Sequence, residues 1–118
     1  MKLIYVAGPF SAPTREGVEE NIMRAESLAV DVALLGACPI CPHANTSHPA
    51  FEKAQPYQFW IDATLEMLRR CDAVIFTRNW QKSSGARGEH EDAVRRGQPV
   101  FYSIGELQRW LETQGGDK

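Results

Sequence analysis

Four short apolar runs alternate along this chain with longer segments in which apolar residues recur every three or four positions. The apolar runs lie at residues 3–7, 37–41, 72–77 and 99–102, and the periodic segments at 16–35, 57–70, 85–96 and after Ser103. Runs without polar alternation are typical of strands covered on both faces, and strands that alternate with helices give a parallel sheet between helical layers. We therefore predict an α/β fold: a small flavodoxin-like or Rossmann-like three-layer sandwich with four parallel strands in the order 2-1-3-4 and helices on both faces.

Glycine, proline and serine mark where these elements begin and end. Gly36 and Gly97 follow the first and third periodic segments, as expected for helix C-termini. Pro39 lies in the second apolar run, and a missing N–H is harmless only at a sheet edge, so we expect that strand at an edge. Ser103 is followed three positions later by a glutamate, which predicts a capping box at the last helix. Residues 42–56 contain three prolines, and we expect no regular structure there.

Length and charge exclude several classes of protein. The 118 residues suit one domain, which we place at 1–113, followed by a frayed tail at 114–118. The net charge of −2 offers no broad cationic surface for duplex nucleic acid or an anionic membrane. No apolar run approaches the roughly 18 residues of a membrane-spanning helix, and the start does not read as a signal peptide. Three cysteines, an odd number, argue against a disulfide framework, so we predict a cytoplasmic protein.

The predicted strand order fixes where a ligand would bind. In open parallel sheets the crevice lies beyond the carboxyl ends of the strands where their order reverses, which here is between the first and third strands. The segments that arrive there are 8–11, 42–43 and 78–89. Trp60 and Trp80 flank this position, and each either stacks on a planar ligand or belongs to the core.

Residues 83–89 open the third helix with the sequence Ser-Ser-Gly-Ala-Arg-Gly-Glu. The first N–H groups of a helix have no intrahelical partner, so this helix start, its serines and Arg87 suit an anion such as phosphate. The alternative is that Ser83 or Ser84 only caps the helix. Glu89 lies near the positive end of the helix dipole, which favours an ionised carboxylate; the alternative is a solvated surface residue.

Two common nucleotide-binding signatures are absent, since the chain has neither Gly-x-Gly-x-x-Gly after its first strand nor a P-loop. Cys38 and Cys41 have Cys-x-x-Cys spacing, but strand geometry points them to opposite faces, and neither opens a helix as thioredoxin chemistry requires. We predict no metal and no cofactor. His43 leaves the second strand toward the crevice, and we predict that it contacts the substrate.

Three stretches carry a family likeness: Tyr5-Val6-Ala7-Gly8-Pro9, Cys71-Asp72-Ala73-Val74, and residues 83–89 followed by Ala93 and Gly97-Gln98-Pro99-Val100. Together they resemble the nucleoside 2-deoxyribosyltransferase-like superfamily, in particular a small uncharacterised bacterial and phage branch and the 2′-deoxynucleoside 5′-phosphate N-hydrolases. The likeness covers about residues 1–104.

The resemblance implies an enzyme that acts on the N-glycosidic bond of (deoxy)nucleosides or their monophosphates. In such enzymes a carboxylate attacks C1′, and the glycosyl group then passes to water or to another base. By motif position, the resemblance assigns the nucleophile to Glu89, its orientation to Tyr5 and a 5′-phosphate contact to Ser83. It also implies a homo-oligomer, a dimer or a tetramer, in which a neighbouring subunit helps to close the site.

Two positions depart from the family pattern. Thr64 stands where the family carries its second acid, and Pro9 stands where the phosphate-binding hydrolases carry a serine. The departing base needs a proton. We expect Asp62, the nearest carboxyl, to supply it, with Glu66 as the other candidate.

We therefore predict hydrolysis, or base transfer, at the N-glycosidic bond of a nucleoside or nucleoside 5′-monophosphate. The predicted catalytic residues are Glu89, Tyr5 and Asp62. The predicted substrate-binding residues are Gly8, Pro9, Phe10, His43, Trp60, Asn79, Trp80, Ser83, Ser84, Gly85 and Arg87. One alternative is a non-catalytic module that senses a nucleotide-derived ligand in the same crevice, and another is an interaction protein that binds no small molecule.

Overall fold

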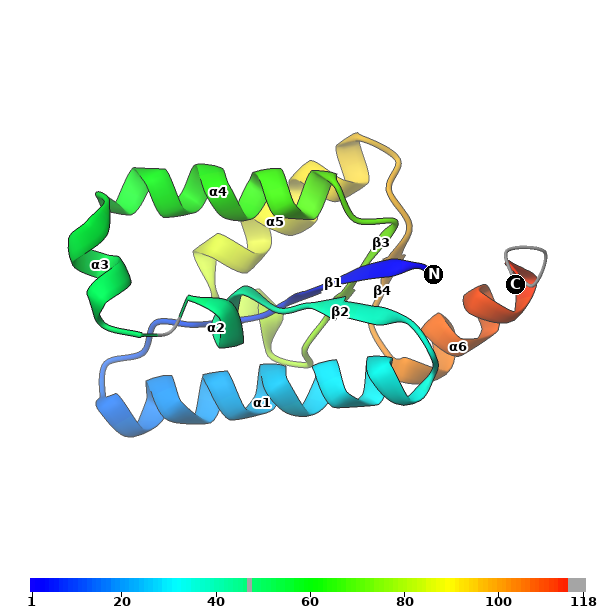
Figure 1. Ribbon diagram of the computed structural model, residues 1–118, viewed down its shortest axis with the longest axis horizontal. Helices are drawn as coiled ribbons and strands as arrows, with labels where there is room; N and C mark the ends of the chain where they lie inside the picture. Colours follow the sequence, from blue (N-terminus) through cyan, green and yellow to red (C-terminus); the bar gives the residue numbers. More distant parts are fainter. Residues whose placement is uncertain (47, 115–118) are drawn as a thin grey trace.

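The computed structural model describes residues 1–46 and 48–114, which form a sheet between two layers of helices (Figure 1). The strands are all parallel and lie in the order β2-β1-β3-β4. Their bounds are Leu3–Ala7 for β1, Cys38–Ile40 for β2, Ala73–Phe76 for β3 and Val100–Phe101 for β4. The predicted α/β class and the strand order 2-1-3-4 are confirmed.

Long helices cover both faces of this sheet. The helices α1 (Arg15–Leu34) and α6 (Ile104–Thr113) lie on one face, and α4 (Tyr57–Arg69) and α5 (Ser84–Arg95) lie on the other (Figure 1). Pro39 lies in β2 at the edge of the sheet, as its missing N–H predicts.

The strand β1 runs through the middle of the sheet and supplies side chains to both helical layers. Because successive side chains of a strand point to opposite faces, Ile4 and Val6 join the core beneath α1 and α6. Tyr5 and Ala7 join the other core, where Leu68 of α4 packs. This alternation places the Tyr5 side chain, which is only 1% exposed, on the side of α4 and α5.

The predicted helix ends are present. Gly36 follows α1 with φ of 87° and Gly97 follows α5 with φ of 74°, a left-handed conformation that costs glycine least. The Ser103 hydroxyl accepts a hydrogen bond from the Glu106 N–H at 3.2 Å. The Glu106 carboxylate in turn accepts one from the Tyr102 N–H at 2.8 Å. The Ser103 bond is that of the predicted capping box, whereas Glu106 reaches the N–H of Tyr102, one residue before the N-cap Ser103 that a capping box uses.

The expectation of an irregular segment at 42–56 was wrong. Two short helices lie there, α2 (Pro42–Asn45) and α3 (Ala50–Ala54). Elsewhere in the chain, a 3-10 turn, η1 (Trp80–Lys82), lies between β3 and α5. Proline fits the first turn of a helix because it has no N–H to leave unpaired. Helices of four or five residues are too short to show an apolar period, so the sequence pattern does not reveal them.

The described chain continues one residue beyond α6, to Gln114, and the rest of the predicted tail, 115–118, lies outside the described residues. Within the described part, none of the helices is both long enough and apolar enough to cross a membrane.

Candidate functional site

Tyr5 of the central strand and Glu89 of α5, which are 84 positions apart in the sequence, lie in contact. The Tyr5 hydroxyl donates a hydrogen bond to Oε2 of Glu89. Tyr5 is held by the buried middle of β1, and Glu89 lies on the face of α5 that is turned toward the sheet. The two residues that the sequence predicts as nucleophile and orienter are therefore in direct contact.

Burial sets the protonation of this pair. Desolvation raises the pKa of Glu89 to about 7, and the hydrogen bond from Tyr5 acts in the opposite direction. Desolvation also raises the pKa of Tyr5 well above its usual range, the Glu89 charge adds to this, and the Thr64 hydroxyl counters it. At neutral pH, Tyr5 is therefore a neutral donor, and Glu89 is divided between its ionised and protonated forms.

The pair lines a cavity of about 810 Å³. The cavity extends from the carboxyl ends of β1 and β2 into the groove between α4 and α5, and α2 and α3 contribute to its wall. Residues from the three segments predicted to reach the crevice, 8–11, 42–43 and 78–89, line this cavity, but none of its described lining residues belongs to β3, beside which the strand order predicts the ligand. Of the predicted site residues, those that line the cavity are Tyr5, Gly8, Phe10, His43, Trp60, Ser83, Ser84, Gly85 and Glu89.

The start of α5 supports both interpretations of its serines. The Ser83 hydroxyl accepts a hydrogen bond from the Ala86 N–H at 3.1 Å, so Ser83 caps the helix. Ser83, Ser84 and Gly85 also line the cavity, together with Lys82, a cation that the sequence prediction did not include. Arg87 is exposed and donates to the Gln81 carbonyl at 2.7 Å, so its guanidinium is bound to the preceding turn.

Three other predicted binding residues make contacts within the protein. Pro9 is buried, and its carbonyl lies 2.8 Å from Nε2 of His43. Asn79 accepts a hydrogen bond from the Thr77 hydroxyl at 2.8 Å. Trp80 stacks on His90 with ring centroids 4.3 Å apart, which favours its interpretation as a packing residue.

The two carboxyls proposed as proton donors have other partners. Asp62 is exposed and accepts a hydrogen bond from Gln58 at 3.0 Å. Glu66 is exposed and forms an ion pair with Arg70 at 2.7 Å. Among the described residues, neither carboxyl belongs to the cavity lining.

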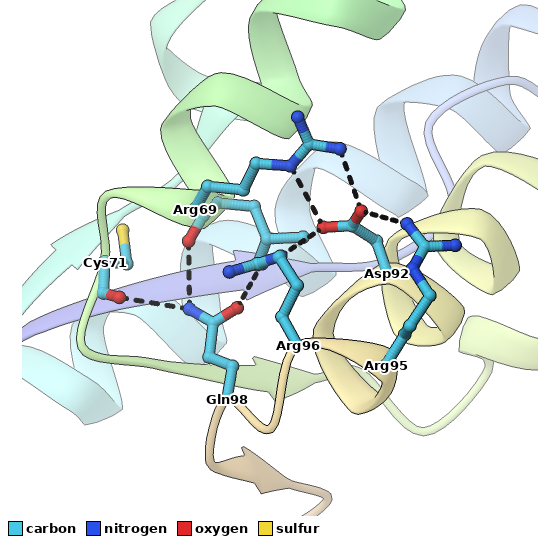
Figure 2. Close-up of polar contacts among 7 residues, drawn as sticks. Arg69, Cys71, Asp92, Arg95, Arg96 and Gln98 are labelled. Atoms are coloured by element: carbon cyan, nitrogen blue, oxygen red, sulfur yellow. Dashed lines mark hydrogen bonds and ion pairs between the residues drawn. The ribbon is translucent and has the colours of Figure 1, made fainter.

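Three arginine side chains surround Asp92 in a network (Figure 2), and part of this network lines the cavity. Asp92 is 4% exposed and accepts hydrogen bonds from Arg69, Arg95 and Arg96, of which Arg69 and Arg95 line the cavity. Gln98 extends the network, since it accepts from Arg96 at 2.6 Å and donates to the Cys71 carbonyl at 3.0 Å.

The sequence prediction missed this network, although the spacing of Asp92 to Arg95 and Arg96, three and four positions along a helix, is a signal for paired charges. On α4 it included Trp60 but missed the rest of the row that lines the cavity, formed by Ile61, Thr64, Leu65 and Arg69. The three- and four-residue spacing of that row is visible in the sequence, but it does not say which neighbour the helix face meets.

By sequence, residues 2–103 match a family described as a domain of unknown function (DUF7768). No curated protein matches the chain. Among solved structures, the chain is similar to a 2-deoxyribosyltransferase from the psychrotolerant bacterium Bacillus psychrosaccharolyticus, with 24% identity and a TM-score of 0.59 over 83% of this chain and 69% of that one. At this identity the likeness shows a shared α/β fold.

Proposed function

The chain belongs to this domain family of unknown function, and we propose that it is an enzyme that cleaves the N-glycosidic bond of a nucleoside or nucleoside 5′-monophosphate. The observation that carries the proposal is the hydrogen bond from Tyr5 to Glu89 in the wall of a cavity large enough for such a ligand. The fold shared with a 2-deoxyribosyltransferase is consistent with it.

In the proposed reaction, the ionised Glu89 carboxylate attacks C1′ of the sugar. The C1′–N bond breaks, its electron pair leaves with the base, and a glycosyl ester forms on Glu89. Tyr5 holds Glu89 by one oxygen and leaves the other free to attack. Water then attacks C1′, the C1′–O bond to Glu89 breaks, and the proton of the water passes to solvent, which releases the sugar and restores the carboxylate. Attack by a ring nitrogen of a second base in place of water, with loss of its proton to solvent, gives transfer. We favour hydrolysis.

The departing base also needs a proton. Asp62 and Glu66, the candidates from sequence, are exposed and bound to other side chains. Ser84, Gly85 and Tyr57 line the cavity and are exposed, so solvent reaches the site. We propose that the proton comes from water. We further propose that the sugar or phosphate oxygens lie by Ser83, Ser84 and Lys82, and that the base lies against Phe10 or Trp60.

Incubation with a panel of (deoxy)nucleosides and their monophosphates, with chromatographic detection of free base, tests the proposal. We expect release of base with at least one substrate and a loss of at least about 100-fold in Glu89→Gln. Glu112→Gln, an exposed glutamate of α6, is the matched control and keeps wild-type activity. Release that is undiminished in Glu89→Gln, or no release with any substrate, contradicts the proposal.

A second candidate function is a non-catalytic sensor of a nucleotide-derived ligand in the same cavity. The observation that favours it is that neither candidate acid lines the cavity. A sensor shows saturable thermal stabilisation by a nucleoside or nucleotide without release of base.

The homo-oligomeric state and the cytoplasmic location stay predictions, which sedimentation and cell fractionation test.

A further inference from the structure

The loop between β1 and α1 is held by side chains from two other elements. His43 of α2 reaches the Pro9 carbonyl, with Nε2 and the oxygen 2.8 Å apart. Asn21 of α1 donates from Nδ2 to the Phe10 carbonyl at 3.1 Å and to the Ser11 carbonyl at 3.4 Å. Three consecutive carbonyl groups of the loop are therefore bound from outside it.

The chemistry of His43 fixes its part in this arrangement. A carbonyl oxygen only accepts hydrogen bonds, so Nε2 of His43 must carry a hydrogen and donate a hydrogen bond to the Pro9 carbonyl. His43 is 7% exposed, and desolvation lowers its pKa, so the ring stays neutral. Its Nδ1 is buried and lacks a hydrogen-bond partner among the described residues. An unpaired buried acceptor costs stability, and a leucine would fill this place without that cost. What the histidine adds is its bond to the loop.

Phe10 lies between these two attachments. Its ring meets the His43 ring edge-on, with centroids 5.6 Å apart and planes at 60°. Phe10 is partly exposed and lines the cavity, so one side of the ring packs on His43 and another is open to a ligand. The carbonyls before and after its Cα are both bound, which restricts the backbone that aims this ring.

We propose that His43 and Asn21 are positioning residues that hold the β1–α1 loop, and with it Phe10, as a preformed wall of the cavity for the base. The functional half of this inference rests on the proposed function. A loop that is already ordered pays less conformational entropy when a ligand binds, so the pair should improve substrate binding more than the chemical step.

Limited proteolysis of the full chain by chymotrypsin tests the structural half. Chymotrypsin cuts after Phe10 only when the loop leaves its place. We expect cleavage at Phe10–Ser11 to be at least about fivefold faster in His43→Leu and in Asn21→Asp. Asn21→Asp keeps the shape of the side chain but loses the Nδ2 donor. His43→Gln, which restores a donor, and Asn45→Asp, an exposed matched control for charge, should cleave at the wild-type rate. Cleavage at Phe76, which is 1% exposed, reports global unfolding. Unchanged cleavage at Phe10, or an increase only in step with Phe76, overturns the proposal.

Kinetics on whichever substrate releases base tests the functional half. In Asn21→Asp we expect KM to rise about tenfold while kcat stays within about twofold, because only ground-state positioning is lost. Asn21→Asp introduced into the Phe10→Ala variant should raise KM little further, because both substitutions act through the Phe10 ring. A fall in kcat at constant KM, or full additivity with Phe10→Ala, overturns the positioning role. If the wild type releases no base, the proposed function fails, and proteolysis alone decides this inference.

Discussion

Arg69 of α4 and Asp92 of α5 join the two helices that border the cavity. Nε and Nη2 of Arg69 lie 3.3 and 2.9 Å from the two carboxylate oxygens of Asp92. Hydrogen bonds from Arg69, with further ones from Arg96, hold the pKa of Asp92 at about 2. Since Asp92 lies one helical turn after Glu89, this junction also fixes the helix that carries Glu89.

Asp92→Asn should destabilise the protein at neutral pH. The folded-state pKa lies below the ordinary value of 3.8, so the carboxylate contributes stability above about pH 4 and loses it as pH falls toward 2. The shift corresponds to roughly 2 kcal/mol. We expect urea unfolding at pH 7 to show a loss of about 2 kcal/mol, and a smaller difference at pH 2.5. Glu66→Gln, which breaks an exposed pair, should cost about 0.5 kcal/mol or less. An equal loss at both pH values contradicts this account.

Much of the fold is predictable from the sequence because its signals are local. The apolar run of β1, the glycines after α1 and α5 and the box at Ser103 each report the state of their own segment. The short helix α2 is not predictable in this way, since it depends on packing of Pro42 and His43 against the rest of the chain. The helix α3 has no buried residue, and its five residues are too few to show an apolar period.

Gly8→Ala should destabilise the end of β1. A Cβ at Gly8 would lie 2.5 Å from the Thr77 hydroxyl oxygen and 2.8 Å from its methyl carbon. Overpacking of this kind costs about 1–3 kcal/mol. Thr77→Ala removes both atoms, so the double variant should recover part of the loss in urea unfolding. Gly88→Ala is the control, because a Cβ there meets nothing within 4 Å and alanine favours the helix. Simple additivity of Gly8→Ala and Thr77→Ala would show that the contact is not the cause.

As with the fold, part of the candidate site is predictable from local sequence signals, and part depends on residues far apart in the sequence. The sequence places Tyr5 at a strand position and Glu89 on a helix, and the strand order brings both to one cavity. Which side chains already have partners depends on three-dimensional neighbours. Arg87 turns to the Gln81 carbonyl, a contact that no spacing in the chain indicates. Asp62 turns to Gln58, four positions earlier on the same helix, and this spacing allows the contact without showing that it forms.

Glu89→Gln should stabilise the protein at high pH. The folded-state pKa of Glu89, about 7, lies above its ordinary value of 4.5, so ionisation costs more in the folded state. Stability attributable to this group is intact below pH 4.5 and is lost as pH rises through 7. We expect the free energy of unfolding of the variant, measured in urea, to equal that of the wild type at pH 4 and to exceed it by about 1–3 kcal/mol at pH 9. Glu112→Gln should show no such dependence, and a stabilisation of Glu89→Gln at pH 4 as large as at pH 9 would contradict the assignment.

Tyr5→Phe should weaken and shift the activity proposed above. If the nucleophile is ionised Glu89, kcat/KM rises with pH through about 7. The hydrogen bond from Tyr5 lowers the pKa of Glu89, so its removal should move this rising limb to higher pH and reduce the maximal rate about 10- to 100-fold. Tyr102→Phe, which among the described residues removes the hydroxyl's contact with His90, is the matched control. A rate that falls through pH 7 would instead make the protonated carboxyl the active form and exclude Glu89 as the nucleophile.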